Sequence, residues 1–378
     1  MRFLLVMPEF NEGHFTIDMG IMLQKLSERT SWTVTIASER PVAVPRNLQN
    51  VAFGTRSLAS LVHLWRNGRR VDVLQLMHFT WRTVLRALLF RSINAFGVCY
   101  VKLDLSEPPM QSLESQVRHV AWRWFYRLGL RAIDIVSVES SDMYDRFARF
   151  MRSISDARTP EMLLVPSCGF DVDEVSERID RGIALASGPD FLHVGRLGAR
   201  PKATEVLLEA FRILVEEFGW HGSLVLVGKT VDQFEIRLAS WRQQVLPTTA
   251  EMLSVHGAIS DRRQLMDMYL QARAFVIASR QEGVPNVFVE AAACGCLLVG
   301  TPVGQVVDVI RSVGRGWIAA IDDPRALAGA MRNASAELDD DRRRRERMRN
   351  FYAEYSWSAV IERLAAVLET LVLRRSRG

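Results

Sequence analysis

Two turns in the second half of the chain contain residues of the types and spacing that bind a phosphate group. In the first turn, Gly195, Arg196 and Lys202 follow an apolar run and precede a stretch with helical periodicity. Glycine lets the backbone approach a ligand, and the amino end of a helix favours anions. A guanidinium matches phosphate oxygens, and an ammonium adds a point charge. We expect a diphosphate site here; a solvated arginine in an ordinary loop is the alternative from this pattern alone.

The second turn, residues 279–290, follows another apolar run and carries Glu282 and Glu290. Pro285 suits a first helical turn, so we expect Glu282 in the loop and Glu290 inside the following helix. The amides just after Pro285 would then present the positive end of the helix dipole. This arrangement would hold an anion and place two carboxylates beside it that can bind sugar or ribose hydroxyls.

The elements that must position these turns are parallel strands and helices. Apolar strand-like runs alternate with amphipathic helical patterns, which is typical of parallel sheets covered by helices. We predict strands at 3–7, 33–37, 73–77, 98–103, 133–138 and 163–165, and again at 191–194, 224–227, 253–256, 274–278 and 297–299. Helices are predicted at 17–29, 82–91, 113–130 and 143–151. The expected fold class is α/β, with two doubly wound, Rossmann-like domains facing across a cleft and ligands at the carboxyl ends of the strands.

Length and composition agree with this architecture. The 378 residues suffice for two domains, and 48% hydrophobic with 24% charged residues excludes a disordered chain or a disulfide scaffold. The four cysteines form no C-x-x-C pair, and Cys294 and Cys296 are expected to be buried thiols. The chain shows no signal peptide and no apolar run of 18 residues, so no membrane-spanning helix is expected.

The second half resembles a known family. The tract from His256 to Asp323, with Ser279-Arg280-Gln281-Glu282-Gly283 and the Glu-x7-Glu helix, resembles the donor-binding domain of family-4 glycosyltransferases, which have the GT-B fold. The tract GRLGARPKATEVLLEAF is similar to the family's Arg/Lys phosphate motif. Residues 165–171 resemble its interdomain segment, and 355–357 resemble the start of its last helix. A charged, glycine-containing stretch separates the two sets of strands and predicts a linker at 172–189, between a first domain at 1–171 and a second at 190–355. The resemblance implies that the first domain binds the acceptor, that the second binds the donor, and that a helix, 356–378, crosses back to the first domain.

The resemblance implies transfer of a sugar from a nucleotide-sugar donor, with retention at the anomeric carbon and usually without a metal. Matched position by position, the resemblance implies that the diphosphate is bound by Arg196, Lys202 and the amides of Asn286 and Val287. It implies that the donor sugar is bound by Glu282, Gly283 and Val284. It implies that the nucleoside is bound by Glu290, Ile259 and Gly195. The donor is a substrate, and no cofactor or metal is expected. Asp171-Val172-Asp173 spells a metal-binding Asp-x-Asp, but we interpret it as solvated acids at the linker.

The chain departs from the family in ways that affect catalysis. Ala203 follows Lys202 where the family often has glycine, and Gly304-Gln305 stands where many members have two glycines. The His-Asp that commonly ends the fourth strand of the family is absent. Asp104 is the best match to the acid, and Lys102 or His78 could replace the histidine; a buried Lys–Asp pair that only fixes the loop is the alternative. Together with Glu282, these are the catalytic candidates. The family's glycine-rich first loop is reduced to Gly13 and His14, which we expect to form an acceptor loop.

The acceptor is inferred from a basic stretch in the first half. Residues 56–131 hold twelve basic and four acidic side chains, and aromatic residues lie among the basic ones, including Trp65, Phe79, Trp81, Trp122, Trp124, Phe125 and Tyr126. Basic helices with tryptophan and leucine faces can lie in an anionic membrane interface. We expect a cytoplasmic protein that attaches peripherally to the inner face of the plasma membrane; core aromatics with solvated arginines are the alternative.

The function predicted from the sequence is therefore a retaining glycosyltransferase that acts on a glycan or lipid-linked acceptor. Its expected setting is bacterial surface polysaccharide or lipopolysaccharide assembly, and no nucleic-acid partner is expected because no matching module is present. Two alternatives stay open: a non-catalytic relative that binds nucleotide-sugar as a partner protein, and an epimerase of the same fold.

Overall fold

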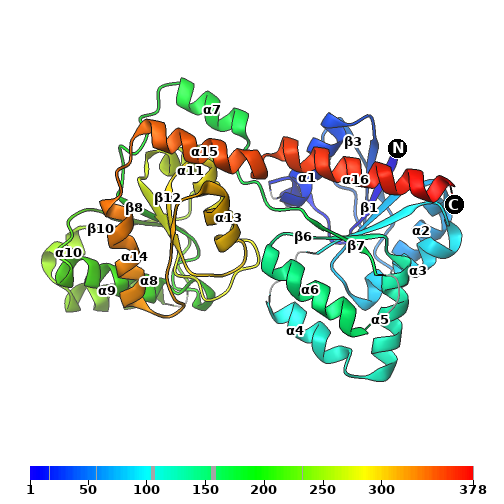
Figure 1. The fold of residues 1–378 in the computed structure, drawn as a ribbon, viewed down its shortest axis with the longest axis horizontal. Helices are drawn as coiled ribbons and strands as arrows, with labels where there is room; N and C mark the ends of the chain where they lie inside the picture. The colour runs from blue at the N-terminus through cyan, green and yellow to red at the C-terminus, as the bar shows by residue number, and fades with distance from the viewer. Residues whose placement is uncertain (17, 57, 104–106, 155–158, 232, 378) are drawn as a thin grey trace. The chain divides into compact units, whose positions relative to one another are not determined.

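The structure is a computed structural model, and it describes residues 1–16, 18–56, 58–103, 107–154, 159–231 and 233–377. The chain divides into two compact units (Figure 1). The first contains Met1–Pro166 and Trp357–Gly378, and the second contains Ser167–Ser356. The chain therefore enters the second unit once and returns to complete the first.

The first unit is built on a seven-stranded parallel sheet with the order β3-β2-β1-β4-β5-β6-β7. Its strands are β1 (Arg2–Val6), β2 (Thr33–Ser38), β3 (Leu48–Ala52), β4 (Val73–Met77), β5 (Val98–Lys102), β6 (Ile135–Val138) and β7 (Glu161–Leu164). Its helices are η1 (Glu12–Thr16), α1 (Asp18–Arg29), α2 (Ala59–Asn67), η2 (Gly68–Arg70), α3 (Trp81–Ile93), α4 (Glu107–Gln116), α5 (Val120–Ala132), α6 (Ser141–Ile154) and α16 (Trp357–Arg377).

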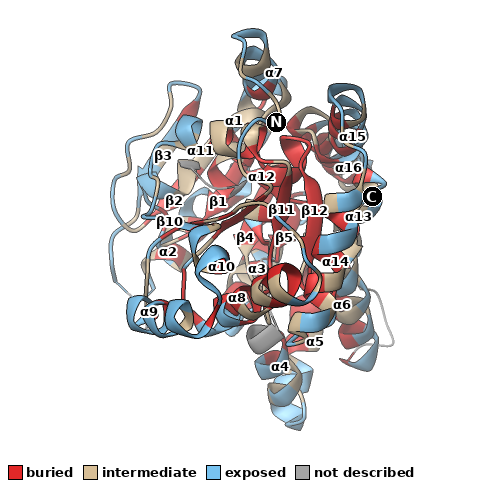
Figure 2. Ribbon diagram, turned by 90° about the vertical axis from the view of Figure 1, so that its left-hand side faces the viewer, coloured by how far each residue is buried: buried red, intermediate tan, exposed pale blue. Residues whose placement is uncertain are grey.

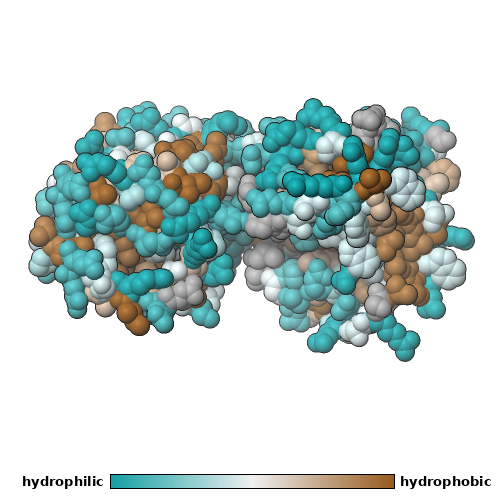
Figure 3. Space-filling model, turned by 90° about the horizontal axis from the view of Figure 1, so that it is seen from below, coloured by the Kyte–Doolittle hydropathy of each residue, from teal (hydrophilic) through white to brown (hydrophobic). Residues whose placement is uncertain are grey.

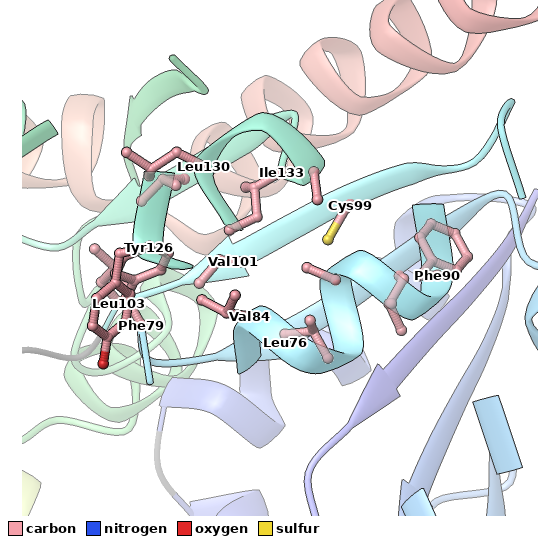
Figure 4. Close-up of a cluster of buried hydrophobic side chains, with 14 of the residues drawn as sticks. Leu76, Phe79, Val84, Phe90, Cys99, Val101, Leu103, Tyr126, Leu130 and Ile133 are labelled. Atoms are coloured by element: carbon pink, nitrogen blue, oxygen red, sulfur yellow. The ribbon is translucent and has the colours of Figure 1, made fainter. Parts of the chain in front are cut away.

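The core of the first unit lies between its sheet and the covering helices α3, α5 and α6. Leu76 and Val101 on neighbouring strands β4 and β5 pack with Val84 of α3 and Leu130 of α5 (Figure 4). These strands are apolar along their whole length because helices cover both faces of a parallel sheet. The edge strand β3 is different: it carries Gln49 and Asn50 and is largely exposed.

The C-terminal helix α16 is tied to the first unit by a buried acid. The side chain of Asp134, at the start of β6, is 1% exposed and pairs with both Arg91 of α3 and Arg375 of α16. It also accepts a hydrogen bond from the Cys99 amide at 2.9 Å. A carboxylate with this many donors tolerates burial, and it fixes the end of α16 against β6.

The second unit is built on a six-stranded parallel sheet with the order β10-β9-β8-β11-β12-β13. Its strands are β8 (Phe191–Val194), β9 (Leu224–Val227), β10 (Leu253–His256), β11 (Ala274–Val276), β12 (Leu297–Gly300) and β13 (Trp317–Ile318). Its helices are α7 (Val172–Asp180), η3 (Arg200–Lys202), α8 (Thr204–Arg212), η4 (Ile213–Glu217), α9 (Phe234–Gln244), α10 (Pro247–Glu251), α11 (Arg262–Gln271), α12 (Asn286–Ala293), α13 (Val306–Val313), α14 (Pro324–Ala336) and α15 (Asp341–Tyr355).

Burial follows the sheets in both units. Figure 2 shows β4, β5, β11 and β12 as buried strands, whereas exposed residues gather on the outer helices. The predicted α/β class, with two doubly wound parallel sheets, is confirmed. All four cysteines are buried and form no disulfide. In the part of the chain that the structure describes, no helix is both long enough and apolar enough to cross a bilayer.

Several parts of the chain differ from the sequence expectations. The polar strand β3, the helix α2 and the two-residue strand β13 were not predicted. Residues 113–130, predicted as one helix, form α4 and α5 with a turn between them. The structure places the chain crossings after Pro166 and after Ser356, and residues 172–189 lie within the second unit. They are not an open linker there, because helix α7 buries Val175 in the core of that unit.

Candidate functional site

A pocket of about 360 Å³ opens at the carboxyl ends of β8 and β9. This is the edge of a doubly wound sheet where ligands bind. The residues that line it are Val194, Gly195, Arg196, Lys202, Val227, Gly228, Lys229, Ala258, Ile259 and Leu265. The structure thus brings together four residues that the sequence singled out, namely Gly195, Arg196, Lys202 and Ile259. It adds Gly228 and Lys229, which were not predicted.

The two turns that form the pocket are in direct contact because one position is glycine. Gly228 has φ +148°, and a Cβ built on it would lie 1.7 Å from the carbonyl oxygen of Gly195. Beyond this contact the turns run on side by side, since the Leu197 amide donates to the Lys229 carbonyl at 2.9 Å. This pairing holds Lys229 next to the turn that carries Arg196.

The pocket is cationic. Arg196, Lys202 and Lys229 line it, and no acidic side chain does among the residues that the structure describes. The turn that carries Lys202 ends at Ala203, which has φ +48°, a left-handed conformation that favours glycine. This explains why glycine suits the position after the lysine and shows that alanine occupies it with backbone strain.

Lys202 is joined to the second predicted turn by an ion pair. Its Nζ lies 2.6 Å from Oε1 of Glu282, and both side chains are largely buried. The same carboxylate oxygen accepts a hydrogen bond from the hydroxyl of Ser279 at 2.7 Å. Ser279 is fixed in turn, because its carbonyl accepts from the Thr301 hydroxyl at 2.5 Å. The carboxylate of Glu282 is therefore held beside the cationic pocket in a defined position.

Glu290 lies in α12 as predicted from the spacing, and it is only 8% exposed. Its Oε1 accepts from Arg262 at 3.1 Å, and its Oε2 accepts from the Tyr269 hydroxyl at 3.2 Å. Arg262 also donates to the Gly169 carbonyl and stacks on the ring of Phe170 at 4.4 Å. Sequence reasoning missed Arg262, because nothing in its local pattern indicates a partner 28 residues away.

The start of α12 departs in one detail from the predicted anion site. The Asn286 amide donates to the Val284 carbonyl at 3.0 Å and so is engaged within the turn. The Val287 amide follows it in the first turn of α12, where helix amides can meet an anion. Gly283 is packed against Gly304, which has φ +52° and whose built Cβ would lie 2.2 Å from the Gly283 carbonyl oxygen. A side chain at 304 would therefore displace this turn.

A buried histidine that was not predicted lies next to this pocket. His193, in β8, is 1% exposed, and its Nδ1 lies 2.9 Å from the Val276 carbonyl oxygen. Its Nε2 is buried without a hydrogen-bond partner in the described part of the chain. Burial lowers the pKa of His193 to about 4; the bond to Val276 opposes this shift, and the charge of Lys202 adds to it. The ring is therefore neutral at physiological pH.

Two catalytic candidates of the first unit, Lys102 and His78, lie at the carboxyl ends of its strands. The Lys102 ammonium at the end of β5 is buried and pairs with Glu139 after β6. The amide of His78, which follows β4 with φ +56°, donates to the Lys102 carbonyl at 2.9 Å. Asp104 lies outside the described residues. Ionic stabilisation of Lys102 comes from Glu139.

The predicted acceptor loop follows β1. Gly13 and His14 belong to η1, and the His14 ring stacks on Phe10 with centroids 4.9 Å apart. The His14 Nδ1 lies 3.1 Å from the Asn11 amide, which closes this turn on itself.

No group of three or more histidine, cysteine, aspartate or glutamate side chains that could hold a metal is found within the described ranges. Asp171 of the Asp-x-Asp sequence is the N-cap of α7, and its side chain accepts from the Asp173 amide at 3.4 Å. This contact gives Asp171 a structural role as a helix cap.

The geometry can be compared with known proteins. Residues 188–337 match the family model described as Glycosyl transferases group 1. This segment is therefore similar to the group 1 glycosyltransferases. The match spans β8 to β13 and includes every residue that lines the cationic pocket.

Further similarities extend beyond this segment. The GDP-mannose:cellobiosyl-diphosphopolyprenol alpha-mannosyltransferase of Xanthomonas campestris is 24% identical over 251 residues, which are 66% of this chain and 62% of the relative. The chain thus matches less than two thirds of that protein's length. The structure of HepE from Anabaena in complex with UDP aligns with a TM-score of 0.67 and 15% identity, over 98% of this chain and all of that one. A trehalose-6-phosphate synthase studied for glycosyl transfer with retention aligns with a TM-score of 0.72 and 11% identity, over 98% and 99% of the two chains. These similarities confirm the predicted GT-B fold.

Proposed function

We propose that this protein is a retaining, metal-independent glycosyltransferase that moves a sugar from a nucleotide-sugar to a glycan or lipid-linked acceptor. The observation that carries the proposal is the ion pair between Lys202 and Glu282 beside a cationic pocket inside a segment similar to the group 1 glycosyltransferases. A cation suited to a diphosphate and a carboxylate suited to sugar hydroxyls are thereby held side by side.

The reaction breaks the bond between the anomeric carbon and the donor diphosphate, and the electron pair leaves on the diphosphate. The acceptor hydroxyl oxygen forms the new bond to that carbon, and its proton goes to the departing diphosphate. Arg196, Lys202 and Lys229 line the pocket and can offset the charge that develops there, which is the role a metal plays in other transferases. Glu282 would bind hydroxyls of the donor sugar, with Gly283 and Val284 beside it. The nucleoside would lie along Gly195 and Ile259, and Glu290, oriented by Arg262 and Tyr269, would bind the ribose.

A lipid-linked acceptor is supported by the curated relative, whose name gives a diphosphopolyprenol acceptor and a GDP-mannose donor. We propose an acceptor of the same class for this chain, in the assembly of a bacterial surface polysaccharide or lipopolysaccharide. GDP-mannose is accordingly the first donor to test.

The surface of the first unit supports peripheral attachment to an anionic membrane. Helix α3 packs against both α2 and α5, and tryptophans are exposed on all three: Trp65, Trp81, Trp122 and Trp124. Figure 3 shows hydrophobic side chains gathered on one face of this unit among hydrophilic ones. Two of the predicted aromatics, Phe79 and Tyr126, are instead buried in the core, with ring centroids 5.2 Å apart. The membrane proposal therefore rests on the four tryptophans and the arginines of these helices.

The deciding experiment is a transfer assay with a panel of GDP-, UDP- and ADP-sugars and polyprenyl-diphosphate-linked oligosaccharides. We expect release of a nucleoside diphosphate together with a glycosylated acceptor whose new linkage keeps the anomeric configuration of the donor. If the protein binds a nucleotide-sugar but releases no nucleoside diphosphate with any acceptor tested, the result would favour the non-catalytic partner protein. A change of sugar configuration without acceptor would favour the epimerase.

A further inference from the structure

The Nε2 of His193 is a buried polar atom that lacks a partner next to the proposed donor site. Buried polar groups are almost always hydrogen-bonded, so an exception calls for a physical account. No described group donates to this nitrogen, and the ring itself is 1% exposed. The neighbouring Nδ1 faces the Val276 carbonyl oxygen at 2.9 Å. Because a carbonyl can only accept, Nδ1 carries the proton, and Nε2 of the neutral ring is an acceptor.

The position of Nε2 identifies the donor that can reach it. A Cβ built on Gly195 would lie 3.3 Å from this nitrogen and 3.9 Å from Cδ of Lys202. The imidazole and the lysine stem therefore face the same small space beside Gly195, which a side chain at 195 would fill. The nitrogen is buried, so a ligand in the pocket does not touch it directly. The ammonium of Lys202, with three donors on a flexible stem, is suited to do so.

Among the described residues, the hydrogen bonds of the Lys202 ammonium reach one side chain, which leaves donors for further partners. One of its protons goes to Glu282 at 2.6 Å. A diphosphate in the pocket would attract a second proton, and sugar hydroxyls on Glu282 would compete with the first. The ammonium then needs a neutral acceptor that holds it in place and leaves its positive charge available to the phosphate.

We propose that His193 is a positioning residue: its Nε2 accepts a hydrogen bond from the Lys202 ammonium when a nucleoside diphosphate occupies the pocket, and so directs the ammonium at the diphosphate. This inference rests on the proposed function and deepens it. It also accounts for the glycine at 195, because a larger residue would separate the two side chains.

Two substitutions of His193 distinguish the contribution of Nε2 from that of Nδ1. The amide of H193N can keep the bond to Val276 but offers no acceptor at the Nε2 position, whereas H193Q places a carboxamide oxygen near that position. The probes are GDP, UDP and ADP, titrated by calorimetry into the full-length protein, with K202M and H193N/K202M measured beside the single variants. Thermal unfolding without ligand checks that each variant is folded.

We expect the nucleoside diphosphate that wild type binds to bind H193N about tenfold more weakly, the worth of one hydrogen bond to a charged group. H193Q should lie within about threefold of wild type. In the K202M background, H193N should have no further effect, because His193 acts only through Lys202. If H193N weakens nucleoside diphosphate binding equally in the wild-type and K202M backgrounds, or in neither, the inference is overturned and the proposed function stays intact. If wild type binds no nucleoside diphosphate, the proposed function itself fails.

A spectroscopic measurement tests the inference should H193N not fold. In wild type carrying ¹⁵N-labelled histidine, the Nε2 resonance of His193, assigned by its loss in H193Q, should move upfield on saturation with the nucleoside diphosphate. The same resonance in K202M should stay where it is. An unchanged wild-type resonance, or an equal change in K202M, would refute the role of Lys202 as donor.

Discussion

The Lys202 ammonium lies 2.6 Å from the Glu282 carboxylate, and this contact joins two turns that are 80 residues apart in the sequence. One turn follows β8 and the other follows β11, which are neighbours in the second sheet. Because both strands end at the same edge of a parallel sheet, the cation and the carboxylate meet there. The proposed donor site depends on this juxtaposition.

Replacing Glu282 with glutamine should separate binding of the sugar from binding of the diphosphate. The carboxylate would contact sugar hydroxyls, whereas the cations would hold the phosphates, so E282Q should lower transfer about 100-fold. Binding of the nucleoside diphosphate alone should stay within about threefold of wild type. E217Q is the matched control, because Glu217 pairs with Arg325 at the surface. Unchanged transfer by E282Q would remove Glu282 from the reaction.

His193 should make the protein less stable in acid. Its pKa is about 4 in the folded chain, below the ordinary 6.5, so the unfolded state binds more protons between these values. Stability from this group is fully present above pH 6.5 and is lost as the pH falls toward 4, with a magnitude on the order of 3 kcal/mol. The free energy of unfolding should therefore fall less steeply over this range in H193Q than in wild type. Parallel curves for the two proteins would contradict the buried, neutral ring.

Asp134 should dominate the attachment of α16 to the first unit. In D134N, Arg91 and Arg375 lose their shared buried carboxylate, and we expect a loss of about 3 kcal/mol in denaturant unfolding. E161Q removes the exposed pair with Arg374 of the same helix and should cost less than about 1 kcal/mol. Equal effects of the two substitutions would show that burial of the pair does not matter.

The exposed tryptophans should matter for binding to lipid. W65S/W124S should lower co-sedimentation with vesicles of phosphatidylcholine and roughly 30 mol% phosphatidylglycerol by about tenfold. The control I236S/L246S removes two exposed apolar residues from the second unit. Binding of wild type to pure phosphatidylcholine should be weak. Equal binding to both vesicle types would exclude electrostatic attachment.

Much of the fold follows from local sequence patterns. The central strands are continuous apolar runs because both faces of the sheet are covered, and these runs were predicted close to their observed bounds. The edge strand β3 escaped prediction because Gln49 and Asn50 lie in it, and an exposed edge needs no apolar pattern. Residues 172–189 were predicted as a linker from their charges, yet Val175 alone suffices to anchor α7 in the core.

The site residues could be predicted where a local sequence pattern within one turn indicates their role. Gly195, Arg196 and Lys202 could be found from a strand followed by glycine, cations and a helix. Lys229 and His193 were missed, because their places in the site arise from the pairing of β8 with β9 and β11. For Lys229 the clue was present, since it follows an apolar run and a glycine in a chain with four lysines.

The most direct test of the account is calorimetric titration of GDP, UDP and ADP into wild type, K202M and K25M. Lys25 forms a pair with Glu28 on α1 and is the matched control. We predict that wild type binds at least one of the three with a micromolar Kd, that K202M binds it at least about tenfold more weakly, and that K25M matches wild type. Equal binding by K202M and wild type, or no binding of any nucleoside diphosphate to wild type, would contradict the assignment of this pocket as the donor site.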